Sequence, residues 1–206
     1  MSAPKGYTNI IAIENYLLVE IDIGFKDQVE EWIAQMEKYI EQETGRVFIA
    51  DSDASVKKFQ VEPFSPITIG DYRALPKELF IDECVEVAEL KIDGEVISSD
   101  NYLFYPANEL PKTRIKLTDA SGLVFPRGEQ NIEVKAKWGY SVECPDDISF
   151  ATTILVAGTI NFAGEMAGEI KSESIGSFSV TYKDEQGWQD FNRVKEILQK
   201  YTKIVT

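Results

Sequence analysis

The chain has 206 residues, of which 44% are hydrophobic and 27% are charged, the balance of an ordinary soluble globular protein. Its 35 acidic and 21 basic residues give a net charge of −14, which repels nucleic acid phosphates and disfavours tight DNA binding. Histidine is absent, and Cys84 and Cys144 form no CxxC pair, which excludes His-dependent catalytic sites, zinc ribbons and thioredoxin-like sites.

The N-terminal residues have no features of a targeting or membrane segment. A short apolar stretch there is interrupted by Glu14 and Asn15. The longest apolar stretch, 148–163, contains Thr152, Thr153 and Asn161 and is too short to cross a bilayer. We therefore expect the chain to be cytoplasmic when it is synthesised.

Helical spacing first becomes strong over residues 25–43, after a shorter helical turn at about 11–18. The apolar residues recur at steps of three and four and are Phe25, Val29, Trp32, Ile33, Met36, Tyr39 and Ile40. Acidic residues in the first turn suit the helix dipole. Gly45 is expected to end the helix, since glycine readily adopts the left-handed conformation of a helix stop.

The segment 56–140 changes to a period of two, which predicts short β-strands. The strand-like runs are 56–61, 66–70, 78–82, 87–97, 101–106, 113–118 and 131–140. Asp93-Gly94 between two alternating runs predicts a hairpin turn. Six prolines punctuate the segment and favour short strands with loops over one long regular sheet.

Two further helices are predicted in the last third of the chain. Pro145-Asp146-Asp147 is a helix start, and 146–163 is apolar nearly all round, so this helix should be the buried centre. A lone strand-like run, 174–182, precedes the last helix, 188–201. That helix places one apolar stripe along its length, made of Trp188, Phe191, Val194, Leu198 and Tyr201.

These elements predict an α+β fold. The helices 25–43, 146–163 and 188–201 form a small bundle, and a β-rich module, 56–140, is inserted into it. No repeat or low-complexity linker divides the sequence. We therefore expect a single domain spanning 1–206.

One acidic stretch partly matches a calcium-binding loop. Asp51, Asp53, Ser55 and Glu62 occupy positions one, three, five and twelve of an EF-hand loop. Val56 stands at the sixth position, which requires glycine. The prolines that follow also prevent a second helix, so we predict a solvated loop and no metal site.

Two other matches to catalytic motifs are incomplete. Ser55-x-x-Lys58 and Ser99-Asp100-Asn101 imitate two motifs of serine β-lactamases, but Lys112-Thr113-Arg114 departs from the third. The stretch 164–172 lacks the Gly-Lys of a phosphate-binding loop. We therefore predict no enzymatic activity and no cofactor.

The order of several short motifs resembles that of the head-to-tail connector proteins of long-tailed bacteriophages, which are also called head-completion or portal adaptor proteins. The matching features are a helix ending in Thr-Gly-Arg-x-Phe, a β-rich middle with an Asp-Gly hairpin, a Gly-Tyr pair before a Pro-Asp helix start, an Ile-Gly-x-x-Ser-Val-x-Tyr run and a closing helix. They lie at 39–48, 87–94, 138–148, 172–182 and 198–201. Their order covers roughly residues 10–201, and the β-rich middle is longer here than in the common form of the family.

The resemblance implies a structural virion protein that forms a neck adaptor ring, commonly twelve-fold. Such a ring binds the portal protein and neighbouring adaptor subunits, and presents a surface to the next neck or tail protein. It extends the channel through which DNA is packaged and ejected. An acidic lining fits this role, because it lets DNA pass without specific binding.

The C-terminal helix is the predicted attachment site for the portal or a neighbouring subunit. Its apolar stripe and the apolar pair after it form a candidate anchor for a groove on a partner, comprising Trp188, Phe191, Val194, Leu198, Tyr201, Ile204 and Val205. The polar segment 183–187 before it would act as a hinge. Packing on the helix 146–163 is the alternative for the same stripe.

Two other classes of function stay open at this stage. The chain could be another phage neck or tail-terminator component, or a surface protein that binds carbohydrate through its β module.

Overall fold

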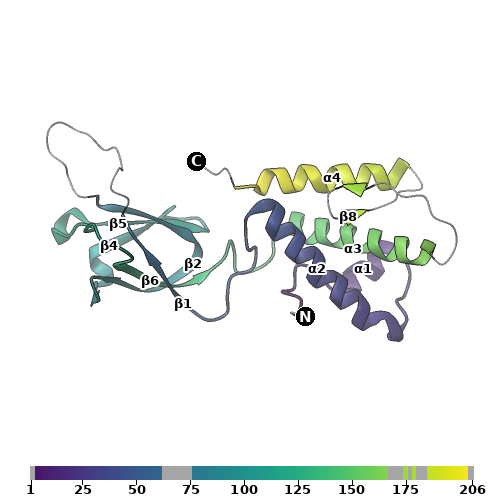
Figure 1. Ribbon diagram of the computed structural model, residues 1–206, viewed down its shortest axis with the longest axis horizontal. Coiled ribbons are helices and arrows are strands. Elements are labelled where there is room, and N and C mark those ends of the chain that lie inside the picture. Colours follow the sequence, from purple (N-terminus) through teal and green to yellow (C-terminus); the bar gives the residue numbers. More distant parts are fainter. Residues whose placement is uncertain (1–2, 62–75, 167–173, 176–177, 180–184, 204–206) are drawn as a thin grey trace. The chain divides into compact units, whose positions relative to one another are not determined.

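The computed structural model describes residues 3–61, 76–166, 174–175, 178–179 and 185–203, with side chains described up to residue 161 and again from 190. The chain has an α+β fold with four α-helices and a six-stranded antiparallel sheet, as predicted (Figure 1). It divides into two compact units. The helical unit comprises 1–48 and 144–206, and the sheet unit comprises 49–143.

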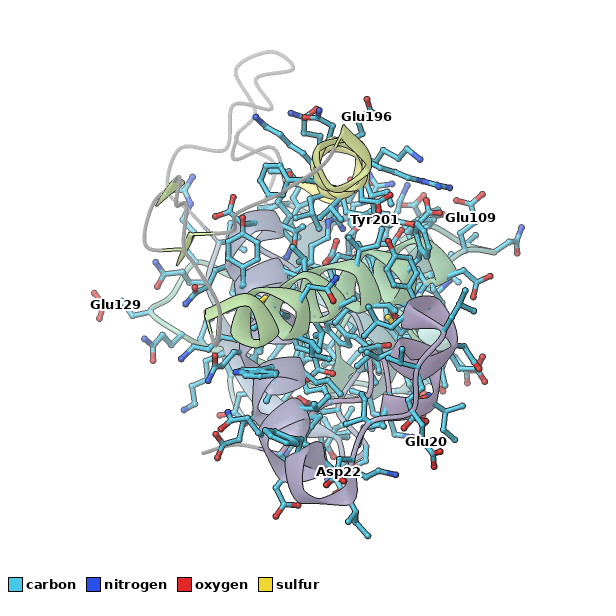
Figure 2. All side chains as sticks on the ribbon, turned by 90° about the vertical axis from the view of Figure 1, so that its right-hand side faces the viewer. Glu20, Asp22, Glu109, Glu129, Glu196 and Tyr201 are labelled. Atoms are coloured by element: carbon cyan, nitrogen blue, oxygen red, sulfur yellow. The ribbon has the colours of Figure 1, made fainter. Side chains whose placement is uncertain are left out.

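The helical unit contains α1 (Ile10–Leu17), α2 (Lys26–Thr44), α3 (Asp146–Met166) and α4 (Glu185–Tyr201), with a short 3-10 helix, η1 (Ile23–Phe25), before α2. As predicted, α3 is central: it packs against the other three helices, and its residues from 151 to 157 are all buried. Figure 2 shows α3 lying between α4 and the pair α1 and α2. The apolar residues around α3 are therefore covered by the three helices that pack against it.

Gly45 ends α2 as the sequence predicts, and a buried carboxylate in its middle holds the N-terminal segment. Gly45 caps its C-terminus with φ of 67° and donates its N–H to the Glu41 carbonyl oxygen at 2.9 Å, as the sequence predicts. Near the middle of α2, Glu37 is 2% exposed. Its carboxylate accepts the backbone N–H groups of Lys5, Gly6 and Tyr7 at 2.6, 2.9 and 2.8 Å. The N-terminal segment is thereby tied to α2.

The sheet unit has the strand order β1-β6-β2-β5-β4, with β3 paired to the end of β2. The strands are β1 (Ser55–Phe59), β2 (Glu78–Ile92), β3 (Glu95–Val96), β4 (Tyr102–Tyr105), β5 (Lys112–Leu117) and β6 (Ile132–Trp138). Its core is a cluster of buried apolar side chains from β2, β4, β5 and β6 that includes Leu90, Ile115, Ile132 and Val134. The predicted run 66–70 lies outside the described residues.

Two strand predictions differ from the structure. The runs 78–82 and 87–97 were expected as separate strands, but β2 is continuous across the first and most of the second. Register shifts near Cys84 and Val87 allow it to bend, so that its first part pairs with β5 and its second with β6. The run 174–182 is not a lone strand, because β7 (Ser174–Ile175) pairs with β8 (Phe178–Ser179).

The Asp93-Gly94 turn is confirmed. Both residues have positive φ, 51° and 84°, between β2 and β3. Such angles match a type I′ hairpin, whose twist suits the strands that it joins. The Asn131 side-chain amide donates to the Asp93 carboxylate at 3.0 Å and holds the turn beside β6.

Candidate interaction surfaces

The predicted attachment stripe lies on α4, and the structure buries part of it. Val194 and Leu198 are buried within the helical unit, as is Ile197, while Phe191 and Tyr201 are half-buried. The Trp188 side chain lies outside the described residues, as do Ile204 and Val205. Val194 and Leu198 of the stripe therefore pack on the other helices of the same chain.

The C-terminal end of α4 is held against the end of α2. The Tyr201 ring meets the Phe48 ring edge-on at 5.4 Å between centroids, and the Tyr201 carbonyl oxygen accepts the Arg46 Nε–H. The Lys203 N–H donates to the Thr44 carbonyl oxygen at 2.9 Å. These contacts account for the position of α4 in the free chain, and partner binding through the stripe stays a prediction.

A second apolar surface lies between α1 and α2, where the sequence predicts no site. The sequence places Phe25 on the apolar face of the helix 25–43, but Phe25 lies in η1, just before α2, and is exposed. Four large side chains are exposed there: Leu18 (89%), Val19 (55%), Ile23 (84%) and Phe25 (63%). We call these four residues the apolar tip. Single exposed apolar side chains are ordinary on protein surfaces, but four within eight residues concentrate exposed apolar area in one short segment, as surfaces used for protein contacts do.

Hydrogen bonds fix the backbone of the apolar tip. The Glu14 backbone carbonyl accepts the Val19 N–H at 3.3 Å, and the Glu14 carboxylate accepts the Ile21 N–H at 3.0 Å. The Ile21 side chain is buried and anchors the loop. The Asp22 carboxylate accepts the Gly24 N–H at 2.8 Å. The apolar side chains are therefore displayed from an ordered loop.

Most of the charged residues close to the apolar tip in the sequence are acidic. The charged residues between positions 14 and 31 are Glu14, Glu20, Asp22, Lys26, Asp27, Glu30 and Glu31. Glu20 and Asp22 are exposed, and Figure 2 shows them near each other, on the opposite side of the helical unit from Glu196 of α4. The segment of the tip therefore combines exposed apolar side chains with a net negative charge.

A third surface lies on the outer face of the sheet, which we call the outer patch. It consists of two cross-strand rows, Phe80–Arg114–Tyr105 and Glu78–Lys116–Leu103, contributed by β2, β5 and β4. Phe80 is 73% exposed and Leu103 is 52% exposed. The patch was not predicted, because the register that aligns these residues comes from strands distant in the sequence.

Cations dominate the outer patch. The Arg114 guanidinium lies 4.9 Å from the centroid of the Tyr105 ring and donates to the Glu78 carboxylate at 2.9 Å. The Lys116 Nζ lies 3.7 Å from the same carboxylate. Two cations therefore share one carboxylate beside two exposed apolar side chains. Aromatic side chains and arginine, both present here, are enriched at interface centres.

The motifs with catalytic or metal-binding resemblance do not assemble into a site among the described residues. Ser55 begins β1, whereas the matching serine of a β-lactamase opens a helix. Within the described ranges, no group of three or more Cys, Asp or Glu side chains is arranged to hold a metal ion. In the same ranges, no helix is long and apolar enough to cross a membrane.

Comparisons with known proteins give a likeness of fold. No protein family profile matches the sequence, and no curated protein matches it. The fold is similar to a chain in the neck of an empty gene transfer agent (GTA) particle computed with C6 symmetry, with a TM-score of 0.58 and 10% identity, covering 100% of this chain and 94% of that chain. It is also similar to a chain in the virion of a native gene transfer agent particle, with a TM-score of 0.55, 11% identity and the same coverage. Both likenesses cover the whole of this chain, so they include the elements of the helical unit and those of the sheet unit.

Proposed function

We propose that this chain is a structural protein of the neck of a phage-like virion, placed between head and tail. The end-to-end fold likeness to a chain of a gene transfer agent neck carries this proposal, because it includes both the helical unit and the sheet unit. The order of sequence motifs supports the same role independently of the fold. A structural role needs no catalytic group or cofactor, which suits a chain without histidine.

Within the neck, the role that we propose is that of an adaptor ring bound to the portal. The similar neck was computed with C6 symmetry, which supports repeated copies of such a chain around one axis. The ring would bind the portal on one side and the next neck or tail protein on the other. It would extend the DNA channel, and would be assembled in the host cytoplasm.

Loss of the gene from its own particle tests the proposal. Particles without this chain are expected to stop as DNA-filled heads that lack tails, and purified full-length protein should restore tail joining in extracts. Electron microscopy of the restored particles should locate labelled protein at the neck in several copies. Complete, infectious particles without this chain would overturn the proposal.

We further propose that the end of the chain contributes to portal attachment. Val194 and Leu198 are buried and the Tyr201 ring packs against Phe48, so this proposal rests on the apolar pair Ile204-Val205 at the end of the predicted stripe. In the same extracts, a chain ending at Lys203 keeps the backbone bond to Thr44 and should fold normally. It is expected to sediment with portal rings less than the full chain. Equal sedimentation of the shortened and full-length chains with portal rings would show that residues 204–206 are not part of the attachment site.

We expect the protein to be inert toward duplex DNA. The net charge of −14 opposes the counterion release that drives protein–DNA association. At physiological salt and micromolar protein, a mobility-shift assay should show no complex. A shift that disappears as salt is raised would mean that a local basic surface binds the phosphates, and would contradict passive passage of DNA.

A further inference from the structure

We propose that the apolar tip of one copy docks on the outer patch of a second copy, and that this contact joins neighbouring subunits. The inference rests on the proposed function in that it names the contact from which a neck ring would be built. The two surfaces are Leu18, Val19, Ile23 and Phe25 on the helical unit, and the rows around Phe80 and Leu103 on the sheet unit.

Both surfaces keep large apolar side chains in water in the single chain. Ile23 and Phe25 on the tip are exposed to 84% and 63%, and Phe80 on the patch to 73%. Removing apolar area from water contributes roughly 25 cal/mol per Å² to association. Covering each surface with the other removes both from water in one contact.

The charges at the two surfaces are opposite. Glu20 and Asp22 border the apolar tip, whereas Arg114 and Lys116 lie in the outer patch and share the single carboxylate of Glu78. Docking tip on patch therefore brings unlike charges together. Tip on tip or patch on patch would bring like charges together, which disfavours both symmetric arrangements.

The tip is already ordered for binding. Its backbone is fixed by Glu14 and Asp22, and the buried side chain of Ile21 anchors the loop. A loop that is fixed before association loses less conformational entropy when it docks. On the patch, the Tyr105 ring and the Glu78 carboxylate similarly hold Arg114 in place.

A contact between two different surfaces has a consequence for assembly. Each copy offers one tip and one patch, so every copy can bind two neighbours in head-to-tail order. Such heterologous contacts close into a ring when the rotation between copies permits it. A self-complementary contact would stop at a dimer.

Cross-linking of cysteine variants of the full-length chain tests the contact. One variant carries Ile23→Cys and another carries Leu103→Cys, and equal amounts are mixed with a short bis-maleimide. When tip and patch are docked, the two thiols have a high effective concentration, so the mixed dimer should exceed a control by about tenfold or more. The control pairs Ile23→Cys with Val96→Cys, which is 61% exposed on β3 and pairs with Lys91 near the other end of β2.

The native cysteines interfere little with this test. Burial raises the pKa of the Cys84 thiol to about 11. Burial, with the nearby charges of Glu37 and Asp146, raises the pKa of Cys144 to about 12. Because the thiolate is the reacting form, both should react roughly a hundredfold or more slowly than an exposed cysteine at neutral pH. The unmodified chain, treated in the same way, measures this background.

The pattern of products decides between contacts. A chain carrying both Ile23→Cys and Leu103→Cys should give a ladder of dimer, trimer and larger products, because each copy is linked at both surfaces. Dimers from Ile23→Cys alone would show a tip-to-tip contact and overturn the proposal. A mixed-dimer yield equal to that of the Val96→Cys control would overturn it as well.

Charge reversal provides a second measurement. Glu20→Lys or Lys116→Glu alone should reduce the cross-linked yield about fivefold to tenfold, and the two together, one on each variant, should restore most of it. Glu196→Lys replaces a carboxylate on the other side of the helical unit (Figure 2) and should not restore the yield of Lys116→Glu. Equal restoration by Glu196→Lys would show a general charge effect and overturn the specific contact.

Failure of this inference is distinguishable from failure of the proposed function. Suppose that the mixed-dimer yield with Leu103→Cys only equals that with the Val96→Cys control, but the purified chain still restores tail joining. The neck role then stands and the contact is wrong. If cross-linking succeeds and the chain is dispensable for tail joining, the contact stands and the neck role is wrong.

Discussion

A chain that ends at Gly187 is expected to lose most of the helical structure of its helical unit. The deletion removes the buried side chains of Val194, Ile197 and Leu198, which pack within that unit. Each contributes roughly 1.5–3 kcal/mol when fully buried, so their combined loss approaches the whole stability of a small domain. The central helix α3 would then expose an apolar face to water.

Circular dichroism measures this outcome. The helical signal should fall by clearly more than the deleted residues account for, while the sheet unit keeps its own core of Leu90, Ile115 and Val134. The chain ending at Lys203 is the matched control, because it retains the whole of α4. A Gly187-ended chain with the remaining helices intact would show that α4 is dispensable for folding, and would leave its stripe available to a partner.

Replacing Glu37 by alanine is expected to destabilise the helical unit by about 3 kcal/mol, because it removes an acceptor shared by three backbone N–H groups, one of which is buried. The Glu37 carboxylate accepts three consecutive backbone N–H groups from Lys5 to Tyr7 and is 2% exposed. Alanine would leave these donors without their acceptor. The N–H groups of Lys5 and Gly6 can turn to water, but the buried N–H of Tyr7 cannot.

Loss of the Glu37 contact should also loosen Tyr7. The Tyr7 hydroxyl donates to the Glu41 carboxylate and accepts the Phe48 N–H at 2.8 Å, and the side chain is buried. Burial and the hydrogen bond to Glu41 raise the pKa of Tyr7 above its usual range. Tyr7 thus links the N-terminal segment to α2 and to Phe48, which follows α2.

Urea denaturation of the two variants Glu37→Ala and Glu43→Ala separates the specific contact from a general effect of removing a carboxylate from α2. Glu43 is exposed, so its replacement should change the free energy of unfolding by no more than about 0.5 kcal/mol. Similar midpoints for both variants would contradict the role given to Glu37. Hydrogen exchange at residues 5–7 should accelerate only in Glu37→Ala.

The tail-joining and cross-linking experiments address different levels of organisation. Tail joining asks where the chain acts in a particle, whereas cross-linking asks which surfaces of two copies meet. Both use exposed positions or the intact chain, so neither depends on the folding effects expected for α4 and Glu37. A protein that carries an acidic apolar tip and a cationic patch would join its copies through surfaces that are complementary but not identical.

The sequence by itself determined the elements whose signals are local. Apolar spacing and the following Gly45 define α2, and Asp93-Gly94 defines the turn between β2 and β3. The all-round apolar pattern of 146–163 correctly predicts a central helix. These features depend on residues within a few positions of one another, so their physical causes can be read directly from the sequence.

Only the tertiary structure decided which surfaces are covered. Periodicity places Val194 and Leu198 on one face of α4, but it does not say whether that face meets the same chain or a partner, and the fold buries both. The outer patch exists because strand register aligns Phe80 with Arg114, residues far apart in the sequence. The apolar tip is exposed because α1 and α2 pack through other residues. Burial and register depend on how distant segments meet in space, which no local pattern determines.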